Sequence, residues 1–377
     1  MDRLLRVNLF AARRFLGSRY SLLLVVLLTA LLLLVGCTQD TEEKEEPKEP
    51  SRLDSAPQTG EASKKEQISL TYLTNPAGTS YYTVAVRQAE VIGKYTNITI
   101  NVQPTPGASS MPGLVESGEA QLAATTAYSA WDAYHGVELE KSYPMLRALL
   151  AGQDTLFGIL TSEATGIKTI RDLKGRKITL DYPAYIFFQK LGRLQLKAYG
   201  IGENEVKILK AESTSRAAQD LVEGRTEAYL DSLQGPKIQE LASKVKVVLL
   251  PFEEDKMPIV DAELPDVVFP VITPDDLPGI PAGVPAVRSP AILWTTEDLP
   301  EEVAYSIVKT LIEHHQEVAE VSPGLFSHYS PEQAVQKLPI PYHPGAIKYY
   351  TEKGFWNAAM DAHQKEIVQA AGTQGGK

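Results

Sequence analysis

The chain has 377 residues, of which 44% are hydrophobic and 22% charged, and its formal net charge is −10. This is an ordinary globular composition, and the length predicts two domains or one domain in two lobes. The acidic balance argues against nucleic acid as a partner, because phosphate binding needs a basic face. The single cysteine, Cys37, excludes intramolecular disulfides and zinc sites built from cysteine and histidine.

The first 36 residues have the pattern of an export signal. Five arginines precede an almost wholly apolar run at residues 22–35, and Cys37 follows directly after Gly36. The run is short for a membrane span, although an uncleaved membrane anchor is the alternative. Leu-x-Gly-Cys at this place resembles the bacterial lipobox, in which the cysteine sulfur carries a lipid. The resemblance implies a lipoprotein signal peptide over 1–36 and lipidation of Cys37.

The stretch that follows is rich in glutamate and proline and contains almost nothing apolar. Because it cannot bury enough surface to fold, we expect a disordered acidic tether over residues 37–67. No later run is long and apolar enough to cross a bilayer. The globular body is therefore expected to be extracytoplasmic, held at a membrane through Cys37, in the periplasm or on the outer cell surface.

From residue 68 onward, strands alternate with helices. The first set comprises strands 68–73, 98–103 and 121–125 and helices 81–95, 111–117 and 128–135. Two strands, 146–151 and 156–161, come next, with a turn at 152–154. The second set comprises strands 177–181, 206–209, 226–231 and 245–250 and helices 185–199, 214–223 and 236–241. This alternation predicts two α/β lobes, each with a parallel sheet covered on both faces.

The rest of the chain is less regular. Prolines crowd residues 251–290 and predict mostly loop. A strand at 291–295 and an amphipathic helix at 303–319 follow.

Motifs for catalysis are missing from the sequence. It has no P-loop, no Gly-x-Gly-x-x-Gly, no His-Glu-x-x-His and no Gly-x-Ser-x-Gly. His314 and His315 are adjacent, so they point to different faces of a helix and form a poor metal site. We expect no enzyme activity, no metal and no cofactor.

A ligand site is expected outside the carboxyl ends of the strands. The loops there are 74–82, 104–110 and 125–128 in the first lobe and 181–188, 211–216 and 231–234 in the second. They are rich in hydroxyl groups and aromatic rings. The junction at 74–82 also directs free backbone N–H groups and the positive end of a helix dipole to one spot, which suits a carboxylate. An ordinary strand–helix loop with a Ser or Thr N-cap is the alternative.

Six segments in order resemble the TAXI-type solute receptors of tripartite ATP-independent periplasmic (TRAP) transporters. They are NPAGTSYY (75–82), QPTPGAS (103–109), ESGEA (116–120), AYHG (133–136), GIKTIRDLKG (166–175) and PIPYHPGAIKYY (339–350). The resemblance implies a type II periplasmic-binding-protein fold, with two α/β lobes joined by a hinge and a ligand cleft between them. It also implies a small organic acid or amino acid as ligand and a TRAP-type membrane permease as partner.

Two stretches depart from that family. Its glycine-rich Gly-Pro-x-Gly-Ser-Gly-Thr-like stretch is replaced at residues 181–187 by an acid and bulky aromatic residues, and its Gln-Ser-Asp is replaced at 125–127. A nest of backbone N–H groups is thereby lost from the second lobe. The predicted cleft is narrower, more aromatic, or suited to a less acidic or partly apolar solute.

Ten residues are our candidates for ligand binding. The junction supplies Gly78, Thr79, Ser80, Tyr81 and Tyr82. The other strand ends supply Thr126, Tyr128, Tyr182 and Asp231, with Arg216 as the first choice of cation ahead of Arg147 and Arg288.

The predicted organisation follows from these assignments. Lobe 1 is expected over 68–160 and lobe 2 over 161–285, and 286–377 returns to lobe 1, with hinges near 156–161 and 290–294. The predicted protein is a monomer that captures a solute by lobe closure and delivers it to a permease. A lipoprotein that presents its solute to a membrane signalling partner and an enzyme on the same fold are the alternatives.

Overall fold

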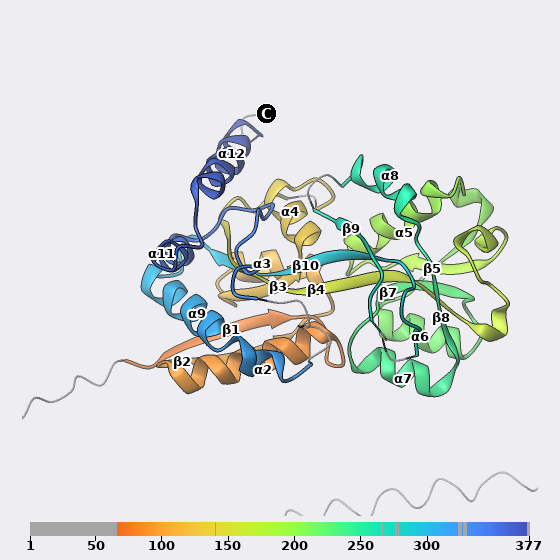
Figure 1. Ribbon diagram of the computed structural model, residues 1–377, viewed down its shortest axis with the longest axis horizontal. Coiled ribbons are helices and arrows are strands. Elements are labelled where there is room, and N and C mark those ends of the chain that lie inside the picture. The colour runs from red at the N-terminus through yellow and green to blue at the C-terminus, as the bar shows by residue number, and fades with distance from the viewer. Residues whose placement is uncertain are drawn as a thin grey trace, which may run out of the picture. The chain divides into compact units, whose positions relative to one another are not determined.

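A computed structural model describes residues 66–139, 141–264, 267–275, 277, 279–322, 326 and 330–374 (Figure 1). The predicted signal peptide, Cys37 and nearly all of the predicted tether lie outside these residues. Among the described helices, none has the length and apolarity needed to cross a membrane. The described residues also hold no group of acidic, histidine or cysteine side chains that could bind a metal ion.

One mixed sheet runs through the described part of the chain. Its ten strands are β1 (Ile68–Thr74), β2 (Ile98–Pro104), β3 (Leu122–Thr126), β4 (Leu146–Ser162), β5 (Lys177–Asp181), β6 (Lys207–Lys210), β7 (Ala228–Ser232), β8 (Val247–Leu250), β9 (Phe269–Ile272) and β10 (Ala286–Thr296). Their order is β2-β1-β3-β10-β4-β7-β5-β6, with β8 beside β4 and β9 beside β10.

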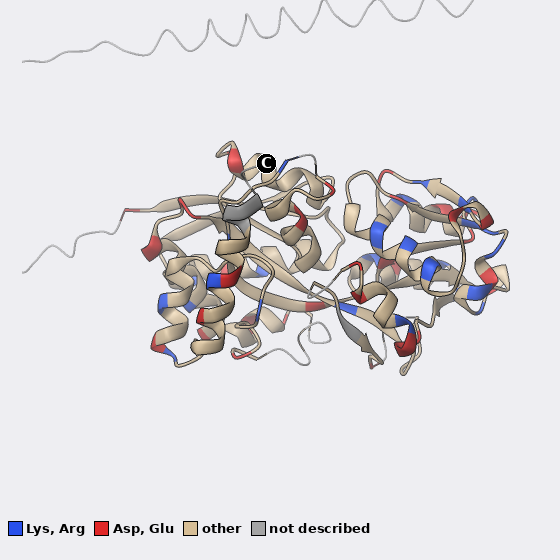
Figure 2. Ribbon diagram, turned by 90° about the horizontal axis from the view of Figure 1, so that it is seen from above, with Lys and Arg blue, Asp and Glu red and all other residues tan. Residues whose placement is uncertain are grey.

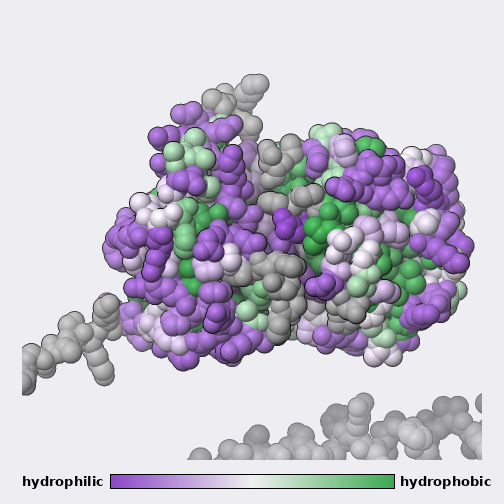
Figure 3. Space-filling model, viewed as in Figure 1, coloured by the Kyte–Doolittle hydropathy of each residue, from purple (hydrophilic) through white to green (hydrophobic). Residues whose placement is uncertain are grey.

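Helices cover this sheet on both sides of the middle strands (Figure 1). They are α2 (Ser80–Tyr95), α3 (Met111–Glu116), α4 (Ala127–His135), α5 (Ile186–Ala198), α6 (Thr214–Val222), α7 (Pro236–Lys244), α8 (Met257–Asp261), α9 (Glu301–Glu313), α10 (His315–Ala319), α11 (Pro344–Glu352) and α12 (Ala358–Gln374). In Figure 2, both acidic and basic residues occur on both halves of the molecule. The face in Figure 3 is largely hydrophilic, with smaller hydrophobic groups between.

Two long antiparallel strands connect two separate hydrophobic cores. One core holds β1–β3, α2, α9 and α11 and includes Ala151 and Ala291. The other holds β5, β7, β8 and α5–α7 and includes Leu156 and Val287. We call the parts around these cores lobe 1 and lobe 2. Strands β4 and β10 pass from one core to the other, so the chain runs from lobe 1 into lobe 2 and back.

The predicted α/β class is confirmed, but three elements differ from expectation. The turn expected at 152–154 is wrong, because β4 is one strand of 17 residues. Strand β10 begins at Ala286 and not at 291, and it tolerates Pro290 because the register with β4 shifts between Pro290 and Ile292. The helix expected over 303–319 is divided at His314, whose ψ of 26° ends α9. The domain boundaries expected near 160 and 285 stay predictions.

One histidine closes the N-terminus of α11 in lobe 1. The Nδ1 atom of His343 accepts a hydrogen bond from the backbone N–H of Gly345 at 3.1 Å, and its side chain is buried. Burial lowers the pKa of His343 below its ordinary value. The folded protein therefore favours the neutral ring, in which Nδ1 is free to accept.

The lowered pKa of His343 predicts that the free energy of unfolding decreases in mild acid. The pKa of a histidine in the unfolded chain is about 6.5. The contribution of His343 to the free energy of unfolding is therefore complete above that pH, and it is lost as the pH falls through the lower pKa of the folded state. Urea unfolding at pH 7.5 and 5.5 should show a smaller loss for His343→Asn, which keeps a capping oxygen that does not titrate. Equal losses in the two proteins would contradict this role.

Candidate functional site

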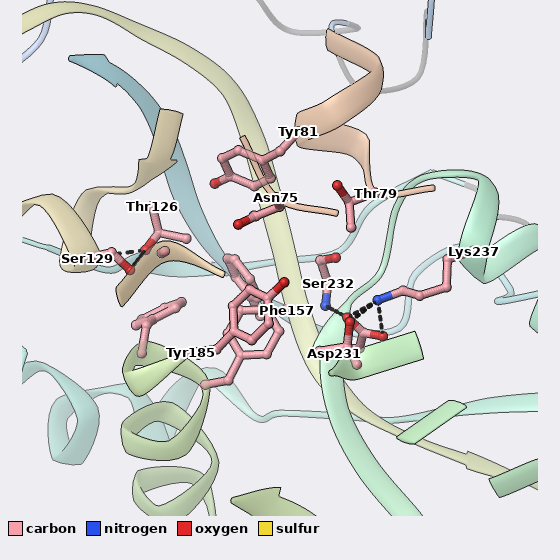
Figure 4. Close-up of a pocket in the computed structure, with 14 residues that line it drawn as sticks. Asn75, Thr79, Tyr81, Thr126, Ser129, Phe157, Tyr185, Asp231, Ser232 and Lys237 are labelled. Atoms are coloured by element: carbon pink, nitrogen blue, oxygen red, sulfur yellow. Dashed lines mark hydrogen bonds and ion pairs between the residues drawn. The ribbon is translucent and has the colours of Figure 1, made fainter. Parts of the chain in front are cut away.

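A cavity lies where the two lobes meet (Figure 4). Its lining residues are Asn75, Thr79, Tyr81, Ala108, Thr126, Ser129, Phe157, Tyr185, Phe187, Phe188, Thr214, Asp231, Ser232 and Lys237. The volume among them is about 450 Å³ when the gaps between atoms and the part that is open to solvent are both counted. All six loops that were expected at strand ends contribute to this lining.

Five helices begin at this cavity. Thr79, Thr126 and Tyr185 are the N-cap residues of α2, α4 and α5. Thr214 is the first residue of α6 and Lys237 the second of α7. Because the first N–H groups of each helix have no partner within that helix and carry partial positive charge, their convergence favours an anionic group in the cavity.

The β1–α2 junction contains buried polar atoms that the protein leaves unsatisfied. Among the described residues, Thr74 Oγ1, Asn75 Oδ1 and Ser80 Oγ have no hydrogen-bond partner. Asn75 also lines the cavity, on the side of Tyr81 and Thr79 in Figure 4. An unpaired buried polar group costs about 1–3 kcal/mol, so such a cluster is typical of a place that a ligand completes.

The opposite side of the cavity holds a buried ion pair. Lys237 Nζ lies 2.7 Å from Asp231 Oδ1 and 2.6 Å from Oδ2, and it donates to Thr214 Oγ1 at 2.5 Å. The side chain of Asp231 is 0% exposed and that of Lys237 is 8% exposed. Burial raises the pKa of Asp231, and the nearby Lys237 ammonium opposes that change. The two charges therefore neutralise each other inside the site.

Aromatic rings from lobe 2 form the floor. Phe157 packs edge-on against Phe187 and Phe188, at centroid distances of 5.1 and 5.5 Å. Tyr185 lies 5.1 Å from Phe188. Burial raises the pKa of Tyr81 and Tyr185, so both phenols stay protonated and can donate hydrogen bonds.

The two lobes touch each other around this cavity. The backbone N–H of Lys237 donates to Gly78 O at 3.2 Å, and that of Ser109 donates to Ala184 O at 3.3 Å. Lys190 on α5 pairs with Glu138 after α4 at 3.1 Å. Contacts of this kind on several sides describe a closed arrangement of the lobes.

The structure places four of the predicted residues on the cavity wall: Thr79, Tyr81, Thr126 and Asp231. Gly78, Ser80 and Tyr82 belong to the same junction but do not line the cavity. Gly78 has a φ of 87°, which its lack of a side chain permits, and its carbonyl contacts lobe 2.

The other three predicted residues lie elsewhere. Tyr128 is buried against Phe187 at 5.4 Å between the ring centroids. The hydroxyl of Tyr182 lies 3.1 Å from Leu230 O, to which it donates, within the core of lobe 2. Arg216 is 50% exposed and pairs with Asp220 at 3.1 Å. Of the other candidate cations, Arg288 pairs with Asp154 and Arg147 with Glu297.

Three lining residues, Lys237, Ser129 and Phe157, lie outside all of the loops that the sequence predicted, and Asn75 lies in the predicted junction but was not among the ten candidates. The sequence predicted only arginines as cations, whereas Lys237 lies six residues after Asp231 and is the second residue of α7. Ser129 lies one turn into α4 and donates its backbone N–H to Thr126 Oγ1 at 3.2 Å. Phe157 lies within β4, so no loop pattern identifies it.

The chain belongs to the NMT1-like family, whose model matches residues 72–354. This range begins within β1 and ends just after α11, so it includes both lobes and both crossing strands.

Several solved structures have a similar fold. MatC from Rhodopseudomonas palustris with bound malate matches at 13% identity and a TM-score of 0.50, over 80% of this chain and 98% of that chain. A structure described as a periplasmic transporter matches at 14% identity and a TM-score of 0.50, over 81% and 99%. The substrate-binding protein AbpA of an amino acid ABC transporter, from Streptococcus pneumoniae and bound to L-arginine, matches at 12% identity and a TM-score of 0.43. This match covers 69% of this chain and 94% of that chain.

At these identities the likeness shows the fold, and the expected type II periplasmic-binding-protein fold is confirmed. The expectation that this chain is not an enzyme agrees with its family and with the two neighbours at a TM-score of 0.50.

A methyl group at Gly107 should hinder lobe closure. A Cβ there would overlap the backbone oxygen of Ala184 in the other lobe, while the extended backbone of Gly107 itself accepts any residue. Gly107→Ala is expected to weaken solute binding about tenfold, since steric overlap costs about 1–3 kcal/mol in the closed state. Calorimetry measures the affinity. Gly113→Ala is the control, because its Cβ would be 3.6 Å from the hydroxyl oxygen of Tyr143, an ordinary contact distance. Equal affinities in the two variants would contradict the closure contact.

Tyr182→Phe tests the position of that side chain. Removing a buried hydroxyl that donates to a carbonyl should cost about 1 kcal/mol of folding free energy. Solute affinity should stay unchanged, because Tyr182 does not line the cavity. Reduced affinity at unchanged stability would instead place Tyr182 in the site.

Proposed function

We propose that this protein is an extracytoplasmic solute-binding protein that captures a small organic acid or amino acid by closing its lobes. The observation that carries the proposal is the cavity at the lobe interface, to which both lobes contribute side chains and toward which five helices direct their N-termini. Partial positive charge suits a carboxylate, and the hydroxyl and amide groups around it suit a small polar solute.

Closure is proposed to bend the two crossing strands between the cores. The cores are separated on β4 by residues 152–155 and on β10 by residues 288–290. Gly152 lies in this segment, and the register between β4 and β10 shifts next to Pro290. The hinge expected at 156–161 would fall inside the core of lobe 2, so residues 152–155 are the better candidate. A solute that contacts both lobes favours the closed state by its differential affinity.

The proposed membrane partner and the proposed lipid anchor rest on the sequence. The ordered TAXI-like segments favour a TRAP-type permease as the partner, and the lipobox-like sequence at Cys37 favours a lipid anchor in the membrane. The protein is proposed to act as a monomer, without a cofactor and without nucleic acid. A lipoprotein that presents its solute to a membrane signalling partner is the alternative. Solute uptake by vesicles that contain a cognate permease would distinguish transport from sensing.

A ligand screen tests the binding function. Amino acids, hydroxy acids, keto acids and dicarboxylates should be compared by thermal shift, because a ligand that binds only the folded state raises the melting temperature. We expect a stabilising solute among the small acids. The absence of any shift across these classes would contradict the proposal.

Asn75→Ala tests the site with the solute that such a screen selects. Its amide oxygen lines the cavity without a protein partner, so we expect it to accept a hydrogen bond from the solute. Losing that bond should reduce affinity about tenfold, at a folding free energy no lower than that of the wild type. Asn101→Ala, at an exposed position on β2, is the matched control. Equal affinities in both variants would remove Asn75 from the site.

A further inference from the structure

We infer that the buried Asp231–Lys237 pair is a specificity device that restricts the solute to one carboxylate and rejects dicarboxylates. This inference rests on the proposed solute-binding function and narrows its substrate class. The solute is a small acid whose remaining polar group is neutral or part of a zwitterion and donates a hydrogen bond.

The charges around the cavity carry the first step. Among the described lining residues, Asp231 is the acid and Lys237 the base, so the fixed charges sum to zero. One carboxylate can be held by the partial charges of helix N-termini. A second carboxylate would lose its hydration with no counter-charge, which is costly in a buried site.

The contacts of Lys237 carry the second step. Its ammonium donates hydrogen bonds to Asp231 Oδ1 and Thr214 Oγ1, and Asp231 Oδ2 lies 2.6 Å from the same nitrogen atom in the ion pair. The positive charge of Lys237 is therefore already paired with Asp231, and a solute carboxylate would have to compete with Asp231 for it. Releasing it would leave Asp231, which is fully buried, without its partner.

The unsatisfied acceptor at Asn75 carries the third step. Its Oδ1 atom needs a donor, and an ionised carboxylate has none. A hydroxyl, amide or ammonium group can supply that donor. The aromatic floor at Phe157, Tyr185, Phe187 and Phe188 provides apolar contact for the carbon chain.

Two pairs of nearly isosteric compounds test the restriction on the wild-type protein. Succinamate and succinate differ by one ionised carboxylate, and so do glutamine and glutamate. Calorimetry at pH 7.5 should show that the amide binds at least about tenfold more tightly in each pair that binds. Equal or tighter binding of succinate or glutamate would overturn the inference while leaving the solute-binding function intact.

The substitution Asp231→Asn tests whether the ion pair causes the preference for the amide over the dicarboxylate. The substitution keeps the shape of the side chain but leaves Lys237 with an uncompensated charge in the cavity. We expect the preference between succinamate and succinate to fall about tenfold or to reverse. The double variant Asp231→Asn with Lys237→Met is the control: it restores a neutral site and should keep the wild-type preference. An unchanged preference in folded Asp231→Asn would show that the pair does not set specificity.

The outcomes separate this inference from the proposed function. If the four probes fail to bind but other monocarboxylates do, both stand, and the preference is measured on that hit and its dicarboxylate analogue. If only dicarboxylates bind, the inference is wrong and the proposed solute-binding function stands. If no small acid of any class binds, both fail.

Discussion

The pairing of β4 with β10 is the constraint on which the rest of the structure depends. These two strands pair from Leu146 and Thr296 in lobe 1 to Phe157 and Val287 in lobe 2. Each lobe builds its own core on one end of the pair. Because both cores share the same two strands, the strand ends and helix starts of the two lobes meet at a single place. The cavity is a consequence of that arrangement.

The site combines the partial positive charge of helix N-termini with fixed charges that sum to zero among its described lining residues. Five helix N-termini favour an anion, while Asp231 cancels the formal charge of Lys237 at 2.7 Å. Helix N-termini are rigid donors that do not move or titrate. A free lysine would bind a mono- or dianion with less discrimination. Helix dipoles without an unpaired cation therefore favour a solute with one carboxylate over a solute with two.

Local patterns predicted the order of the α/β elements because each has its own signal. Strand β1 and helix α2 were placed within one residue at each end, since an apolar run is followed by Thr79 as N-cap. The errors fall where long-range pairing decides. Gly152 predicted a turn, yet β4 continues through it because β10 pairs with it on both sides. His314 ends α9 although the apolar pattern continues into α10.

Position in a loop does not by itself decide which candidate residues the structure brings together. The strand-end rule identified the loops, but within a loop it could not tell which side chain faces the cavity. Tyr182 and Tyr185 show the limit, because the first is directed into the core of lobe 2 and the second lines the cavity. The partner of Asp231 was not predictable from spacing alone, since it depends on how α7 begins beside β7. Charge pairing inside a cavity is a tertiary property.

The departure at residues 181–188 now has a physical interpretation. A glycine-rich stretch would offer backbone donors from lobe 2, whereas this chain places Ala184 against Gly107 and Ser109 in lobe 1 and directs Tyr185, Phe187 and Phe188 to the cavity. The backbone of this segment thus makes the lobe contact, and its buried aromatic side chains form the floor of the cavity. Excluding water raises the cost of any charge that lacks a partner. The aromatic stretch and the Asp231–Lys237 pair therefore act in the same direction: the first lowers the local dielectric, and the second withholds the counter-charge that a second carboxylate would need.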